Sequence, residues 1–105
     1  MISGEINNEK LFAIVDNLAD VIAQVNDEVW QAAEVYFKEY KSAQVLSEAA
    51  EKFGFTTEMG VSGIPTAFVC KWGEKGPKIG ILAEYDALPG MSQDTVAYKK
   101  AVKAG

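Results

Sequence analysis

Apolar residues recur at steps of three and four over the first third of the chain. From residue 8 to about residue 31 they form one stripe with polar side chains between them, and this spacing predicts an amphipathic helix. Asn7 or Asn8 is suited to cap its start, and Glu9 suits the positive end of the helix dipole. The stripe consists of Leu11, Ile14, Val15, Leu18, Val21, Ile22, Val25 and Val29.

A second helical pattern covers residues 43–53. The aromatic residues of the interval 32–41 do not extend the first stripe, which predicts a break between two helices. Ser42 is placed to cap the second helix. Gly54 followed by Phe55 predicts its end, because glycine adopts the left-handed conformation that closes many helices.

The hydrophobic period changes to two after Gly54, which indicates strands. The second and third strands flank a five-residue turn at 73–77 and are expected to pair as an antiparallel hairpin. The run 79–83 is almost continuously apolar, as is typical of a strand covered on both faces. A loop from residue 85 and a weakly helical tail over 94–105 complete the single α/β domain predicted for residues 1–105. The three strands are predicted at about residues 55–61, 66–72 and 78–84.

Composition narrows the partners. The 105 residues suffice for one domain or part of one, and the net charge of −5 argues against a duplex-binding surface, as does the small basic cluster of Lys99, Lys100 and Lys103. No nucleic-acid partner is therefore expected. A signal segment and an apolar run of membrane-spanning length are both lacking, and Cys70 has no second cysteine to pair with. These features predict a cytoplasmic protein without a membrane partner.

Candidate chemistry is limited because the chain contains no histidine, the commonest ligand of catalytic zinc and the commonest general base near neutral pH. Glu84 and Asp86 lie at the carboxyl end of the predicted third strand, where ligands gather in open α/β sheets. Residues two apart in an extended segment point to the same side, so these acids suit cation binding or the orientation of a metal ligand. The alternative is a solvated acidic loop. Cys70 is interpreted as a small core residue, since no histidine can activate it.

Short motifs follow one another in a distinctive order. The run from Glu84 to Gln93 is the most specific of them. The series is Asp27-Glu28-Val29-Trp30; Glu34, Phe37, Glu39 and Ser42-Ala43; Gly54-Phe55; Gly63-Ile64-Pro65-Thr66-Ala67-Phe68-Val69; and Ile79 through Gln93. This order resembles the start of the metallopeptidases that include aminoacylases, carboxypeptidases and indole-acetyl-amino-acid hydrolases, above all the aminobenzoyl-glutamate hydrolase branch. The resemblance covers nearly the whole chain, from about Asn8.

The resemblance implies a partial piece of a hydrolase-like zinc-peptidase catalytic domain. Such a domain hydrolyses an amide bond of an N-acyl amino acid or dipeptide by means of divalent metals, zinc or manganese. Glu84 matches a position that is a metal-binding histidine in many relatives, and Asp86 matches the aspartate that supports it. Both are the catalytic candidates. The histidine-rich segment that supplies further ligands in the family is expected beyond Gly105, so this chain is expected to bind no metal tightly and to be inactive alone.

Two other interpretations stay open. One is a small stand-alone protein-interaction or regulatory module, and the other is a calcium or magnesium site formed by Glu84, Asp86 and Asp94. Under the leading interpretation the third strand lacks its neighbours, and unpaired edges with uncovered apolar faces predict a homo-oligomer.

Overall fold

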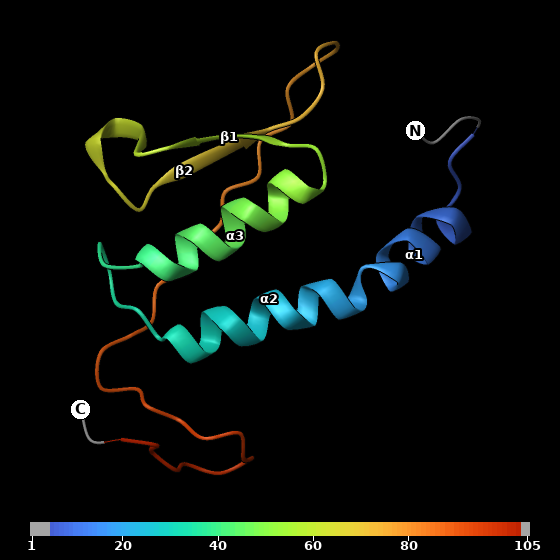
Figure 1. The fold of residues 1–105 in the computed structure, drawn as a ribbon. Helices are drawn as coiled ribbons and strands as arrows, with labels where there is room; N and C mark the ends of the chain where they lie inside the picture. Colours follow the sequence, from blue (N-terminus) through green and yellow to red (C-terminus); the bar gives the residue numbers. More distant parts are fainter. Residues whose placement is uncertain (1–4, 104–105) are drawn as a thin grey trace.

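The computed structural model describes residues 5–103, which form three helices and one two-stranded antiparallel sheet. The mixed α and β content agrees with the predicted class, although the third strand is not formed. Figure 1 shows α2 and α3 side by side, with the β1–β2 sheet on the far side of α3 and α1 projecting away from these layers. The elements are α1 Asn8–Asn17, α2 Ala19–Ala32, α3 Tyr40–Lys52, β1 Thr56–Met59, the short 3-10 helix η1 Val61–Gly63 and β2 Phe68–Lys71.

The single helix predicted over residues 8–31 is divided at Leu18. The Asn7 side chain caps α1 by accepting the Lys10 N–H at 2.9 Å, as predicted. At Leu18 the N–H donates to the carbonyl of Val15 rather than to the residue four back, which tightens the turn and separates α1 from α2. Neither proline nor glycine marks this position, so the hydrophobic stripe continued through it in the prediction.

The predicted break between helices is confirmed over residues 33–39. Ala33 adopts the left-handed conformation with φ of 46° and ends α2, and Phe37 has φ of 59°. α3 then begins at Tyr40, three residues earlier than predicted, so the expected capping role of Ser42 is wrong. Ser42 lies inside the first turn and is buried.

The predicted end of α3 is confirmed in detail. Gly54 has φ of 88°, and its N–H donates to the carbonyl of Glu51 at 2.9 Å. The Phe55 N–H donates to the carbonyl of Ala50 at 3.2 Å, and the two bonds together make a Schellman motif. Helix α3 therefore ends where the glycine permits the chain to reverse toward β1.

Two of the three predicted strands are confirmed with narrower bounds, but their pairing is not the predicted one. β1 pairs antiparallel with β2, with Thr56 opposite Lys71 and Met59 opposite Phe68. The connection is closed by the N–H groups of Gly60 and Val61, which donate to the carbonyl of Ala67 at 2.8 and 3.3 Å. β2 therefore has β1, not residues 78–84, as its neighbour.

The predicted third strand at 78–84 and its hairpin with 66–72 are wrong. The segment forms no ladder, and Ile79, Ile81 and Leu82 are 88, 91 and 96% exposed. An apolar run becomes a buried strand only where partners cover its edges and faces, and residues 5–103 provide no such cover here.

The tail is not helical over its described part, 94–103, and residues 104 and 105 of that prediction lie outside the described residues. Side chains hold it instead. The Gln93 amide donates to the carbonyls of Asp94, Val96 and Tyr98, and its oxygen accepts the Lys100 N–H. These bonds compete with the backbone pattern that a helix requires.

The packed layers bury little apolar surface. Among residues 5–103, Ala43 is the one apolar residue that is fully buried. The radius of gyration is 16.8 Å, whereas a compact chain of this length has about 13 Å. The accessible surface of 9113 Å² exceeds by more than half the roughly 5,800 Å² of a compact monomer of this mass. The fold therefore presents a largely open apolar interior.

Candidate functional site

The predicted acidic pair lies in an extended segment that crosses the sheet and the α2–α3 junction. Tyr85, between the two acids, is half-buried, whereas Glu84 and Asp86 are exposed. This alternation is the one expected when residues two apart share a side, as predicted for Glu84 and Asp86. Tyr85 thus holds the segment to the protein while both acids face outward.

Tyr85 is anchored to the start of β2. Its hydroxyl donates to the backbone carbonyl of Thr66, a residue that is 3% exposed. Its ring lies 5.8 Å from the ring of Phe68 at an interplanar angle of 42°. Burial raises the pKa of Tyr85, and the negative charges of Glu39 and Glu34 raise it further.

A second anchor follows directly after Asp86. The Ala87 N–H donates to the backbone carbonyl of Glu34 at 2.7 Å, and Ala87 forms an isolated parallel bridge with Val35. Asp86 is therefore flanked by two residues that are each fixed to a different part of the fold. Figure 1 shows this orange segment passing from the sheet toward the end of α2.

Glu34 also holds the start of α3. Its two carboxylate oxygens accept the N–H groups of Lys41 at 2.9 Å and Ser42 at 2.8 Å. Burial acts to raise its pKa, but these donors outweigh burial and the pKa is lowered. The buried Ser42 hydroxyl faces the same carboxylate and favours its charged form, although it lies outside regular hydrogen-bond geometry.

The nominal N-cap of α3, Glu39, has a different role. Its side chain is 8% exposed and accepts the Phe37 N–H at 3.0 Å, so it stabilises the left-handed Phe37 rather than the helix. Glu34 and Glu39 belong to the motif series that carries the resemblance, but spacing alone assigned them no role. Their function depends on contacts that only the folded chain makes.

The described residues do not fit a metal centre by themselves. Within residues 5–103 no group of three or more histidine, cysteine, aspartate or glutamate side chains could hold an ion. The calcium or magnesium site of Glu84, Asp86 and Asp94 is therefore wrong, because Asp94 forms an ion pair with Lys100 at 2.8 Å instead. Two exposed carboxylates are too poor a donor set for zinc or manganese.

Cys70 agrees with its structural interpretation. It is half-buried in β2, and its sulfur lies 3.5 Å from the hydroxyl of Thr57 on β1. Nothing in this cross-strand contact activates the thiol.

An apolar groove of about 890 Å³ lies on the other side of the extended segment. α2, α3 and β2 line it together with residues 79–85. Val25 and Val29 face Leu46 and Phe68 across it. A groove lined in this way is the open interior noted above, and it adjoins Glu84 and Tyr85.

Comparison with known proteins gives three hydrolases. The chain is 36% identical over 89 residues to a p-aminobenzoyl-glutamate hydrolase of Escherichia coli strain K12, and this match covers 81% of the chain. It is 34 and 33% identical over 97 residues to thermostable carboxypeptidases 2 and 1 of Saccharolobus solfataricus, and each of these matches covers 90% of the chain. No family model and no solved structure matches.

These similarities place the chain among hydrolases that cleave peptide-like bonds, and the predicted resemblance is confirmed. The chain is homologous to part of the aminobenzoyl-glutamate hydrolase and carboxypeptidase family, on the aminobenzoyl-glutamate branch. It spans about a fifth of these relatives' length, 18% of the first and 24% of the other two. Within residues 5–103 no helix combines the length and apolarity that a bilayer crossing requires.

Proposed function

We propose that the chain is part of the catalytic domain of a metal-dependent amidohydrolase that cleaves N-acyl amino acids such as aminobenzoyl-glutamate. The observation that carries this proposal is the similarity over four-fifths or more of the chain to an aminobenzoyl-glutamate hydrolase and two carboxypeptidases. The double anchoring of the Glu84–Asp86 segment supports it, because a catalytic carboxylate must be held in place by its surroundings.

In this proposal Asp86 orients a neighbouring metal ligand and Glu84 faces the metal-binding region. Residues 5–103 supply only these two carboxylates, so the zinc or manganese ligands would come from elsewhere in the hydrolase. No catalytic step is assigned to the chain itself. Its contribution is to fix the position of Asp86 through Tyr85 and Ala87.

The isolated chain is expected to be inactive. The test is an assay of the purified 105-residue chain on aminobenzoyl-glutamate with zinc or manganese added. We expect no turnover above that of a Glu84→Gln, Asp86→Asn double variant. Turnover by the unaltered chain that the double variant lacks would show that these residues suffice for hydrolysis.

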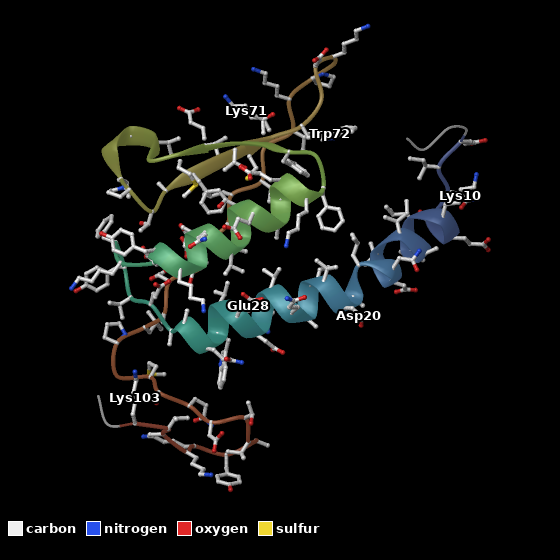
Figure 2. The ribbon with its side chains drawn as sticks, viewed as in Figure 1. Lys10, Asp20, Glu28, Lys71, Trp72 and Lys103 are labelled. Carbon is white, nitrogen blue, oxygen red and sulfur yellow. The ribbon has the colours of Figure 1, made fainter. Side chains whose placement is uncertain are left out.

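The coding sequence beyond Gly105 separates this proposal from a small interaction module. An in-frame glycine-rich run with histidine and cysteine supports the hydrolase. If the frame continues, Asp86→Asn in the longer protein is expected to lower kcat/KM by about 10- to 100-fold, as for other residues that orient metal ligands. Asp20→Asn is the control, since Asp20 lies exposed on the far helix (Figure 2). A stop codon after Gly105 would favour the interaction module.

We also propose that the chain by itself associates with a second copy. Its surface exceeds that of a compact monomer by an amount comparable to the roughly 2,000–5,000 Å² of obligate dimer interfaces. The exposed apolar residues of the 79–83 run border the groove, so both lie on one continuous surface. Covering this surface is the largest available source of stability.

A further inference from the structure

We infer that Glu34 is a positioning residue for Asp86, joining the start of α3 to the backbone that carries the acid. The inference rests on the proposed function for its catalytic meaning, because it is Asp86 that the hydrolase is proposed to use. The physical link between the residues is independent of any activity. It consists of three hydrogen bonds that Glu34 makes with residues far from it in sequence.

The side chain of Glu34 replaces the usual N-cap. The free N–H groups of the second and third residues of a helix are ordinarily satisfied by the side chain of the capping residue. Here Lys41 and Ser42 occupy those positions, and both donate to Glu34 instead. The charge of the carboxylate also suits the positive end of the helix dipole. Glu34 is therefore fixed relative to α3.

The backbone of Glu34 then fixes the acidic segment. Its carbonyl accepts the Ala87 N–H at 2.7 Å, directly after Asp86. Ala33, which precedes Glu34, and Phe37, which follows it, both have positive φ, so the turn between them is a non-regular structure held by side chains. Release of the Glu34 carboxylate frees this turn, and the carbonyl that holds Ala87 moves with it.

Neither partner of this link works alone. Tyr85 anchors the segment before Asp86 through Thr66, which belongs to the sheet side of the molecule. Ala87 anchors the segment after Asp86 through Glu34, which belongs to the helix side. The position of Asp86 is thus determined jointly by the sheet and by the α2–α3 turn, and Glu34 controls the second of these.

The first test needs no substitution. In the isotope-labelled 105-residue chain, the bond predicts a scalar coupling by NMR between the Ala87 amide nitrogen and the Glu34 carbonyl carbon. Detection of this coupling is expected. Its absence, with the Ala87 amide resolved, would overturn the inference whatever the variants show.

The second test compares Glu34→Gln with Glu51→Gln, an exposed position on α3 that undergoes the same change of charge. The glutamine keeps one acceptor but turns a donor toward an N–H, so one of the two helix bonds is lost. We expect hydrogen exchange at Ala87 to accelerate roughly tenfold in Glu34→Gln, the size of one charge-assisted hydrogen bond, while the amides of β1 and β2 keep their rates. Glu51→Gln should leave Ala87 unchanged.

A uniform acceleration at all amides in Glu34→Gln would show general destabilisation and overturn the positioning role, and so would an unchanged Ala87. If the variant does not fold, the coupling in the unaltered chain decides. These outcomes are distinct from failure of the proposed function. Loss of the hydrolase proposal would leave the Ala87 measurements as they are, and failure of the link would leave the similarity to hydrolases intact.

Discussion

The hydroxyl of Tyr85 donates to the backbone carbonyl of Thr66, and this contact fastens the acidic segment to the sheet. Tyr85→Phe keeps the ring against Phe68 but leaves the carbonyl of a buried residue without this donor. We expect a loss of about 1–3 kcal/mol in the free energy of unfolding, measured by urea denaturation. Tyr98→Phe is the control because Tyr98 is 66% exposed. Equal effects of the two substitutions would contradict the anchoring role.

The raised pKa of Tyr85 adds a pH dependence to the same variant. A group whose pKa is higher in the folded state contributes stability that is fully present below its unfolded pKa, here 10.0, and that is lost as the pH rises through the folded value. The unaltered chain is therefore expected to lose stability above pH 10.0 more steeply than Tyr85→Phe. Parallel alkaline declines in thermal melts of the two proteins would show that Tyr85 does not titrate in this way.

Glu34 gives the opposite sign at acid pH. Its pKa is lowered in the folded state, so its contribution is present above the ordinary value of 4.5 and is lost as the pH falls through the folded value. Glu34→Gln is expected to cost about 1 kcal/mol at pH 7, as for other lost helix caps, and progressively less below pH 4.5. Urea titrations at several pH values test this against Glu51→Gln. A difference that stays constant down to low pH would rule out the ionised cap.

The accuracy of the predictions follows the range of the interactions behind them. The helix cap at Asn7 and the stop at Gly54 depend on residues within a few positions of each other, and both are confirmed. The strand at 78–84 depends on partners from elsewhere, and its apolar run indicates a burial that residues 5–103 do not supply. The pattern shows what a segment needs, not whether the need is met.

The candidate site divides in the same way. Glu84 and Asp86 were identifiable from their spacing and from a motif. The role of Glu34 was not, because its carboxylate reaches residues seven and eight positions away and its carbonyl reaches Ala87. The placement of Ser42 as a cap failed for the same reason, since another residue takes over the capping of α3. Tyr85 looked like a spacer between two acids, and only the fold shows that it is the anchor.

Gly54 offers a direct test of the end of α3. A side chain at φ of 88° is strained, and a Cβ there would meet the Trp72 indole nitrogen at 3.8 Å, which is ordinary contact. The cost of Gly54→Ala is therefore conformational and is expected to be about 1–2 kcal/mol. Figure 2 shows Trp72 next to the end of α3. Gly80→Ala is the control, because Gly80 has open space and no left-handed φ. A smaller effect at Gly54 than at Gly80 in urea denaturation would contradict the motif.

Self-association through the 79–83 run can be tested with a single charge. Leu82 is 96% exposed, so Leu82→Asp removes no buried contact from the monomer, but it places a carboxylate on the apolar surface that a second copy would cover. By light scattering after size exclusion, the mass of the unaltered chain is expected to rise above 11.4 kDa with concentration, and that of Leu82→Asp to stay near it. Val102→Asp, at a position that is 66% exposed in the tail, should associate like the unaltered chain. A monomeric unaltered chain at high concentration would show that the open groove does not recruit a second copy. Equal disruption by the two variants would trace the effect to net charge instead, because both substitutions add the same negative charge and differ only in which surface carries it.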